Sequence, residues 1–288
     1  MTDGALATRL VGHRLHLNHG PIDLVIGARG DKAEIERAYA QATAAFPAVL
    51  PALVAELPRL RAPHGQPPSG AVARRMVAAV APFADVFVSP MAAVAGAVAD
   101  AMLEAMVAGR DLAMAYVNDG GDIAFHLAPG ATFDAGIVAD VARPALDAVA
   151  RLDAYSPVRG IATSGRGGRS FSLGIADAAT VLAATAAGAD AAATLIANAV
   201  DLPGHPAIER RPARLLDPDS DLGDRLVTVA VGPLGPAEIA EALDQGAIAA
   251  QAMADRGLIA GAALALRGVW RVLALDSAAR PVIESRQA

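Results

Sequence analysis

The chain has 288 residues, of which 54% are hydrophobic and 3% aromatic, so it can bury a large core and is not a disordered protein. Its formal net charge of −6 argues against a general nucleic-acid binder, because such proteins carry a basic surface that neutralises phosphates. Cysteine is absent, which excludes disulfides, thiolate catalysis and cysteine-based zinc or iron–sulfur sites.

The sequence predicts a protein that stays out of the membrane. The longest apolar run, 178–200, contains Asp190 and Asn198, and alanine is too weakly hydrophobic to offset a carboxylate in the bilayer. The opening residues 1–4 show neither the basic start nor the apolar stretch of a signal peptide. We therefore expect a cytoplasmic location.

The first predicted element is a hairpin over residues 13–26, where polar and apolar residues alternate around a turn at 18–21. A helix is then predicted from Asp31, its N-cap, to about Phe46. Glu34 stands three residues after the cap, which is the spacing of a capping box.

Six prolines follow between residues 47 and 68, and the segment 61–70 is the predicted mobile loop or break between two subregions. The next helix is predicted to begin with Ser89 as N-cap and Pro90 at the first helical position, and to end near Gly109.

Strands and helices mix along the remaining chain without strict β-α-β alternation. Strands are predicted at 112–117, 123–127, 157–163, 171–175, 180–183 and 226–231, with a last pair in 258–275. Helices are predicted at 185–200 and 236–255, with a long loop over 201–224. This order favours an α+β fold with antiparallel sheets packed against helices, in one domain over 1–288 with two intertwined subregions.

Asp190 and Thr194 lie four residues apart on a predicted helix, so both side chains project from one face. A carboxylate and a hydroxyl at this spacing can hold Mg²⁺, which completes its coordination with water and phosphate oxygens. The alternative is a polar stripe in which the Thr194 hydroxyl bonds the carbonyl of Asp190.

Two glycine-containing segments are further candidates. The turn Asn118–Asp122 contains Gly120 and Gly121, which let a ligand approach the backbone, although an ordinary hairpin turn has the same sequence. The segment 163–170 combines glycines, hydroxyls and two arginines, as in an anion-binding loop, but an exposed flexible loop explains it equally well.

Taken in order, these segments resemble the ApbE superfamily, whose best-known members are FAD:protein FMN transferases. Three of its motifs have counterparts: N-x-G-G-D-I at Asn118–Ile123, A-T-S-G at Ala162–Gly165, and A-D-A-x-A-T at Ala189–Thr194. The segment Gly96–Asp100 is similar to its K-G-x-A-x-D helix, with Val98 at the position of the alanine. The resemblance implies an ApbE-like fold and Mg²⁺ ligands at Asp190 and Thr194, with a backbone carbonyl from Val98.

The resemblance also implies a flavin site, with FAD or FMN as ligand or substrate. Its residues would be Asn118, Gly120, Gly121, Thr163, Ser164, Gly165, Ser170 and Ser172, with Asp122 or Asp177 orienting the nucleotide or attacking group. Two features depart from the family: Ala95 replaces the lysine before the glycine, and Ser170–Ala178 replaces an H-I-I-D-P segment. The whole chain is closest to an uncharacterised cytoplasmic branch.

Three functions therefore stay open. The first is a Mg²⁺-dependent enzyme, a flavin transferase or pyrophosphatase, acting on a flavin or another nucleotide diphosphate. The second is a non-catalytic flavin- or nucleotide-binding accessory protein of a redox pathway, which the two departures favour. The third is an interaction scaffold. The expected partner is a small molecule rather than nucleic acid or a membrane, and the alanine-rich helices are compatible with a homodimer.

Overall fold

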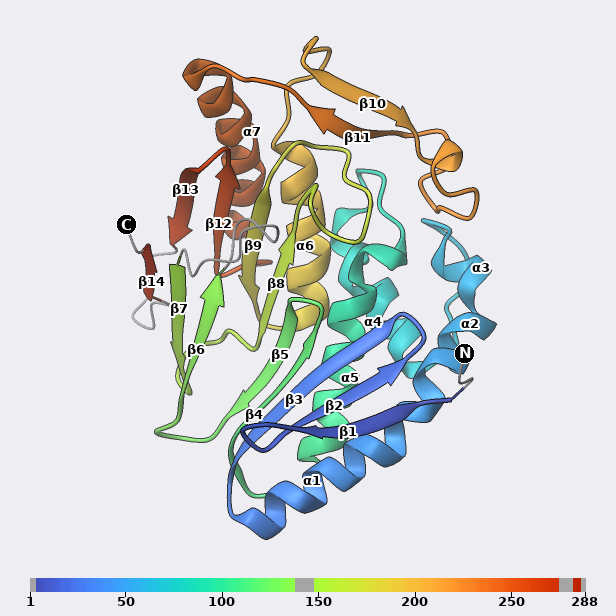
Figure 1. Ribbon diagram of the computed structural model, residues 1–288, viewed down its shortest axis with the longest axis vertical. Helices are drawn as coiled ribbons and strands as arrows, with labels where there is room; N and C mark the ends of the chain where they lie inside the picture. Colours follow the sequence, from blue (N-terminus) through green and yellow to red (C-terminus); the bar gives the residue numbers. More distant parts are fainter. Residues whose placement is uncertain (1–3, 138–147, 275–281, 286–288) are drawn as a thin grey trace. The chain divides into compact units, whose positions relative to one another are not determined.

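The computed structural model in Figure 1 describes residues 4–137, 148–274 and 282–285. It is a mixed α/β fold with a large antiparallel sheet and several helices. The chain divides into two compact units, the first made of Met1–Phe133, Leu152–Ala162 and Ala183–Asp190. The second contains Asp134–Arg151, Thr163–Leu182 and Ala191–Ala288. The two units therefore alternate along the sequence, and the proposed break at 61–70 lies inside the first.

The sheet of the first unit is an antiparallel meander. Its strands pair in chain order: β1 (Leu6–Leu10), β2 (Arg14–His19), β3 (Ile22–Gly30), β4 (Leu112–Asp119) and β5 (Asp122–Leu127). The start of β8 (Gly160–Ser164) then pairs with β5. The predicted hairpin is confirmed as β2–β3. The exposed β1 was not predicted, because its mostly exposed side chains give no buried alternation.

Helices of the first unit pack on this sheet, and α5 (Val94–Val107) contacts both β4 and β5. The other helical segments are α1 (Lys32–Ala45), η1 (Phe46–Ala48), α2 (Val49–Ala55), α3 (Leu57–Leu60), α4 (Ala71–Val80), η2 (Ala81–Phe83) and η3 (Pro90–Ala93). The predicted helix from Ser89 therefore starts with a 3₁₀ turn, whose cap is confirmed by the bond from the Met91 amide to the Ser89 hydroxyl, 3.2 Å long.

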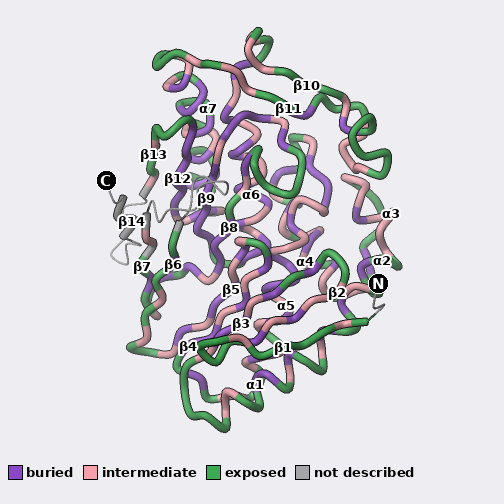
Figure 2. The backbone as a smooth tube through the Cα atoms, viewed as in Figure 1, coloured by how far each residue is buried: buried purple, intermediate pink, exposed green. Residues whose placement is uncertain are grey.

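The proline-rich stretch before residue 61 is helical rather than a plain connection. Prolines stand in the first turns of η1 and α3, where the missing amide costs no helical hydrogen bond. The core of this unit joins β2–β4 to α1 and α5, as the purple segments of Figure 2 show. Its fully buried side chains include Leu17, Leu24, Ile26, Tyr39, Met102 and Met106.

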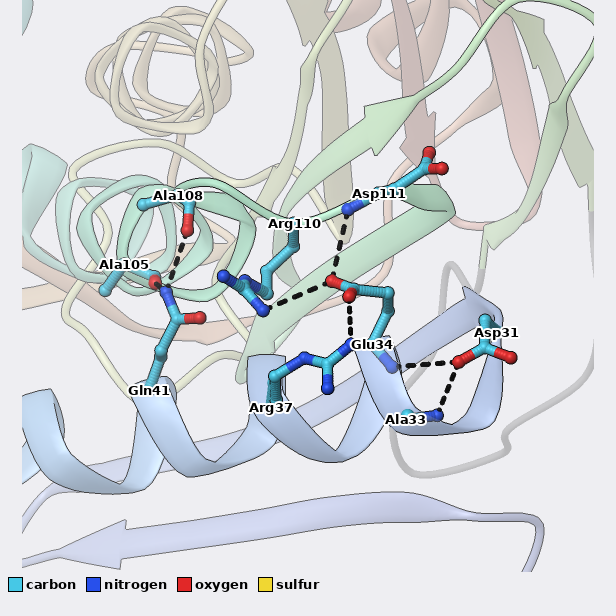
Figure 3. Close-up of polar contacts among 9 residues, drawn as sticks. All are labelled: Asp31, Ala33, Glu34, Arg37, Gln41, Ala105, Ala108, Arg110 and Asp111. Carbon is cyan, nitrogen blue, oxygen red and sulfur yellow. Dashed lines mark hydrogen bonds and ion pairs between the residues drawn. The ribbon is translucent and has the colours of Figure 1, made fainter.

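Figure 3 shows how α1 is fixed to the segment that follows α5. Asp31 caps α1 as predicted, accepting from the Ala33 and Glu34 amides at 2.8 and 3.3 Å. The predicted capping box is wrong, because the Glu34 carboxylate pairs with Arg37 and Arg110 and accepts from the Asp111 amide instead. The bond to Arg37 is the main cause that lowers the pKa of Glu34. The Glu34 carboxylate thus binds two guanidinium groups instead of accepting from the Asp31 backbone amide, as a capping box would require.

In the second unit, β12 (Gly261–Leu266) pairs antiparallel with β9 (Ala178–Ala183) and β13 (Val269–Ala274). Helix α7 (Pro236–Asp255), predicted at these bounds, packs on β12 and β13. The remaining strands are β6 (Thr132–Ile137), β7 (Ala148–Asp153) and β14 (Val282–Ser285) in one sheet, and β10 (Ile208–Pro212) and β11 (Leu226–Val231) in a ribbon.

Two predictions fail in the second unit. Residues 171–175 form no strand, because the Leu173 amide bonds the Asn198 side chain and the Ile175 amide bonds the Val200 carbonyl. The predicted loop 201–224 contains β10 and a 3₁₀ turn, η4 (Ala213–Leu215). β10 is polar and pairs with a strand fourteen residues further on, so no local pattern reveals it.

Two helical stretches, Lys32–Ala55 and Pro90–Val107, are long and apolar enough by composition to cross a membrane. Both supply side chains to the core, such as Ala38 and Tyr39 from the first and Met102 and Met106 from the second. A core helix of a soluble protein passes the same test, so these stretches are weak evidence for a span.

Candidate functional site

The candidate site centres on Asp190, near the start of α6 (Ala186–Ala199). Asp190 belongs to the first unit, whereas Thr194, one helical turn later, belongs to the second, because the division falls inside the helix. The helical repeat places both residues on the same side of α6. The contacts of Asp190 that follow lie within the first unit.

Asp190 accepts a hydrogen bond at the beginning of another helix. Its Oδ2 lies 3.0 Å from the amide nitrogen of Gly96, in the first turn of α5. First-turn amides have no partner within their own helix, so a carboxylate there both completes their bonding and faces the positive end of the helix dipole. Asp190 therefore acts as a distant cap of α5.

Two more carboxylates raise the pKa of Asp190. Asp119 and Asp122 lie directly opposite each other where β4 meets β5, and their exposed fractions are 4% and 9%. Burial is the largest cause that raises the pKa of Asp190 well above its usual range, and the charge of Asp122 and then that of Asp119 add to it. The amides of Gly96 and Ala95 only partly oppose this shift. The three carboxyl groups are thus close enough for their charges to interact.

Asp100 makes the reciprocal contact from α5 to α6. Its two carboxylate oxygens each accept an amide hydrogen bond of 3.0 Å, one from Ala186 and one from Ala187, the first residues of α6. The Thr185 hydroxyl accepts from the next amide, that of Gly188, at 3.1 Å. Burial raises the pKa of Asp100, whereas the two amides lower it. Each helix is therefore capped by an aspartate of the other.

Two glycines permit this close approach. A Cβ atom on Gly96 would lie 2.3 Å from the carbonyl oxygen of Ala186, and one on Gly160 would lie 2.1 Å from the carbonyl carbon of Thr185. Such distances are too short for any side chain, so the first turn of α6 rests directly on the backbone of α5 and β8.

The predicted turn between β4 and β5 is confirmed. Gly120 and Gly121 adopt φ values of +64° and +117°, which favour glycine, and they join strands that end at Asp119 and resume at Asp122. The Asn118 side-chain oxygen accepts from the Gly121 amide at 2.8 Å. Asn118 therefore shapes the turn that holds Asp119 and Asp122 together.

Val98 lies further along α5 with a fully buried side chain. Its carbonyl faces residue 102, which places it within the hydrogen-bond ladder of the helix. The backbone groups of α5 that reach Asp190 are the amides of residues 95 and 96. The metal-ligand role of Val98 stays a prediction.

In the second unit, the glycine-rich segment is a closed turn. The Arg166 amide donates to the Ala176 carbonyl at 2.9 Å, and the Gly168 amide donates to the Gly165 carbonyl at 3.1 Å. A Cβ on Gly165 would lie 2.3 Å from the Asp177 carbonyl oxygen, which explains this glycine. Two amides of the proposed anion-binding loop thus already have backbone acceptors.

Asp177 is bound by arginines of its own unit. Its Oδ1 accepts from Nε and Nη2 of Arg166 at 3.0 and 2.8 Å, and its Oδ2 accepts from the backbone amide of Arg267. These contacts tie the glycine-rich turn to the β12–β13 hairpin, whose turn contains Arg267. The structure therefore gives Asp177 a cross-linking role, and its proposed catalytic role stays a prediction.

Two further predicted residues of this unit, Ser172 and Thr163, also make internal contacts. The buried Ser172 hydroxyl accepts from the Gly174 amide at 3.3 Å and lies 3.4 Å from the Asn198 side-chain oxygen. The Thr163 and Thr180 hydroxyls are 2.9 Å apart. Ser164 is partly buried and Ser170 is exposed. Their role in cofactor binding stays a prediction.

The structure thus brings Asp122 and its turn to Asp190 in one unit, and Asp177 to the glycine-rich turn in the other. Sequence reasoning missed Asp119 and Asp100. Asp119 could have been found from the two-residue turn, which sets its strand neighbours 119 and 122 opposite each other. Asp100 follows Gly96 by four residues, so both share one face of α5. Among the described residues, no three histidine, aspartate or glutamate side chains are arranged as a metal cluster.

Comparison with known proteins identifies relatives rather than an activity. The chain is 43% identical to a UPF0280 protein of Methanothrix thermoacetophila over 115 residues, which cover 39% of this chain and 46% of that relative. It is 34% identical to a UPF0280 protein of Archaeoglobus fulgidus over 143 residues, covering 49% of this chain and 57% of that relative. The chain thus spans about half the length of these relatives.

A family model covers far more of the chain. The model described as "AbpE bacteria" matches residues 7–272, which include both units and every residue of the candidate site. The chain therefore belongs to this family, AbpE bacteria.

Proposed function

We propose that the protein is a Mg²⁺-assisted enzyme that acts on a flavin or another nucleotide diphosphate, with Asp190 and Thr194 as side-chain ligands of the cation. One observation carries the proposal: the Asp190 carboxylate is fixed on the first turn of α5, while burial and then the charges of Asp122 and Asp119 raise its pKa. Carboxylates held together in a partly buried place repel one another, and a divalent cation would relieve that repulsion.

The donor set fits Mg²⁺ by its chemistry. Asp190, Asp122 and Thr194 offer the hard oxygen atoms that this ion prefers, and Mg²⁺ commonly takes only one or two carboxylates and keeps several waters. It therefore does not need a preformed cage of three acidic or histidine side chains. When bound, the ion would supply charge neutralisation for a pyrophosphate and its leaving oxygen.

The chain's own residues would bind and orient the substrate. The glycine turn supported by Asn118 leaves its backbone uncovered, since a Cβ on Gly121 would meet no atom within 4 Å. A phosphate or ribose could thus approach the main chain beside Asp122, whose carboxylate would orient the attacking group. Thr163, Ser164, Gly165, Ser170 and Ser172 of the second unit would contribute hydroxyl and amide groups to nucleotide binding.

The ApbE resemblance supports this proposal at the residues of the first unit. Its G-x-A-x-D, N-x-G-G-D-I and A-D-A motifs supply Gly96, Asp100, Asp122 and Asp190, which are the residues that contact or face one another in the structure. The order of the motifs and their mutual contacts are independent observations. An ApbE-like fold and a cytoplasmic location belong to the same proposal.

One observation favours a second function, a non-catalytic flavin- or nucleotide-binding accessory protein. The position of the family's lysine is Ala95, whose backbone amide, rather than a charged side chain, faces Asp190. A site without the lysine ammonium group would keep its affinity for Mg²⁺ and phosphates, but it would lose one group that stabilises the charge developing in the reaction.

Incubation of the purified protein with FAD, with and without Mg²⁺, distinguishes these functions. Mg²⁺-dependent release of FMN and AMP, abolished in Asp190→Ala, is the result expected of the enzyme. Binding of FAD without products would establish the accessory protein. If wild type neither binds FAD nor forms products, and Asp190→Ala behaves identically, the proposal is wrong. The matched control is Asp31→Ala, which removes a helix cap of the same unit that lies outside the site.

A further inference from the structure

Asp100 is a partly buried acidic group that the proposed chemistry does not use. It stands one helical turn after Gly96 on α5, so the two residues face α6 from the same side. Gly96 donates its amide to Asp190, while Asp100 accepts the amides of Ala186 and Ala187. Both contacts hold the same short segment, residues 186–190.

The orientation of Asp190 depends on this double contact. The Ala186 carbonyl lies against the backbone of Gly96, since a Cβ atom on Gly96 would lie 2.3 Å from the Ala186 carbonyl oxygen. The helix α6 therefore cannot shift toward α5. The two 3.0 Å bonds to Asp100 prevent the opposite movement, away from α5. Asp190 lies one turn from Ala186, so a displaced or frayed first turn would carry its carboxylate away from Gly96 and from Asp122.

We infer that Asp100 is a positioning residue, which fixes the first turn of α6 so that Asp190 presents its carboxylate to a divalent cation. The inference rests on the proposed cation site and adds to it a residue that orients the ligand Asp190 without contacting the cation. Removing a residue that hydrogen-bonds to and orients a metal ligand commonly weakens metal affinity by about 10- to 100-fold.

A charge effect is the competing explanation, since Asp100 also adds negative charge near the cation. Two substitutions separate the causes. Asp100→Ala removes the charge and both hydrogen bonds. Asp100→Asn removes the charge equally but keeps one side-chain oxygen that can accept from Ala186 or Ala187. Positioning predicts that the two variants differ, whereas charge alone predicts that they are the same.

The test is titration of the full chain with Mn²⁺, followed through the electron paramagnetic resonance signal of the free ion, at a temperature where circular dichroism shows each variant folded. We expect Asp100→Ala to weaken Mn²⁺ binding by about tenfold or more and Asp100→Asn by about threefold. Asp31→Ala is the matched control, because it removes a carboxylate that caps α1 through two amides, and it should bind Mn²⁺ like wild type.

The outcomes separate the two hypotheses. If wild type and Asp190→Asn both fail to bind Mn²⁺, the proposed cation site is wrong and the role of Asp100 fails with it. If wild type binds, Asp190→Asn does not, and Asp100→Ala binds like wild type, only the positioning role is overturned. Equal losses in Asp100→Ala and Asp100→Asn that disappear at high salt would also overturn it. If Asp100→Ala does not fold, Asp100→Asn decides instead: a threefold loss that persists at high salt supports the positioning role, whereas no loss, or a loss that disappears at high salt, overturns it.

Discussion

Asp190 and Asp177 are both partly buried aspartates that the sequence marks as site residues, but their surroundings are opposite. Asp177 is neutralised by the Arg166 guanidinium and bonded by the Arg267 amide. Burial and then the charges of Asp122 and Asp119 raise the pKa of Asp190, and the amides of α5 only partly offset this shift. A compensated carboxylate stabilises the fold around it, whereas an uncompensated one costs stability until a cation binds. This difference separates the cross-link at Asp177 from the cation site that we propose at Asp190.

The largest expected effect concerns the contact that sets Asp190 in place. Gly96→Ala should lower the free energy of unfolding by about 3 kcal/mol, because its Cβ would overlap the Ala186 carbonyl oxygen. Urea denaturation measures the change. Gly167→Ala is the control, since a Cβ there meets no atom within 4 Å. Equal stabilities for both variants would show that α5 and α6 are not in this close contact.

Removing the compensated carboxylate should have the next largest effect. Asp177→Ala is expected to cost about 2 kcal/mol, because it leaves the Arg166 guanidinium and the Arg267 amide without their acceptor. Asp244→Ala removes the exposed pair with Arg271 and should change stability by about 0.5 kcal/mol or less. Thermal unfolding of the two variants side by side tests the ranking, and an effect of Asp177→Ala no larger than that of Asp244→Ala would contradict it.

The uncompensated carboxylate should show itself in the pH dependence of stability. Because the pKa of Asp190 is raised in the folded state, the folded protein keeps a proton that the unfolded chain releases. Without divalent cations, stability should therefore fall as pH rises from the ordinary aspartate pKa through the raised one. Asp190→Asn should remove this decline and be more stable than wild type above that window. A variant with the same pH profile as wild type would refute the shift.

The smallest effect is expected at Glu56, a partly exposed carboxylate whose pKa is shifted in the opposite direction. It accepts from the Ser69 and Gly70 amides at 2.8 and 2.6 Å, just before α4, and the Gly70 bond is the main cause that lowers its pKa. The contribution of Glu56 to the free energy of unfolding is present above the ordinary glutamate pKa. It is lost as pH falls through the lowered pKa of the folded state. Glu56→Gln should therefore be slightly less stable than wild type at neutral pH and equal to it in acid. A constant difference would indicate another cause.

The sequence predicts elements whose signals are local. The N-caps at Asp31 and Ser89, the Gly120–Gly121 turn and the bounds of α7 all follow from neighbouring residues. The predictions for β10 and the segment 171–175 were wrong because the partners of these residues are not their sequence neighbours. β10 pairs with β11, and the Leu173 amide bonds the Asn198 side chain. Tertiary pairing overrides local propensity in such segments.

The candidate site likewise has a part that local sequence motifs indicate and a part that they do not. Asp190, Asp122 and the turn were found because they lie in short motifs. The caps by Asp100 and Asp190 could not be predicted, since they join residues about ninety positions apart and depend on which glycines let two helices touch. The pairing of Asp177 with Arg166 was equally hidden, although the sequence singled out both Asp177 and the segment 163–170, which contains Arg166.

The most direct test of the account is the thermal stability of wild type, Asp190→Asn and Asp177→Asn at pH 8, measured with and without Mg²⁺. A cation that binds only the folded protein raises its unfolding temperature. The account predicts that Mg²⁺ stabilises wild type and the destabilised Asp177→Asn by similar amounts and leaves Asp190→Asn unchanged. Equal stabilisation of all three proteins, or of none, would contradict a cation site at Asp190.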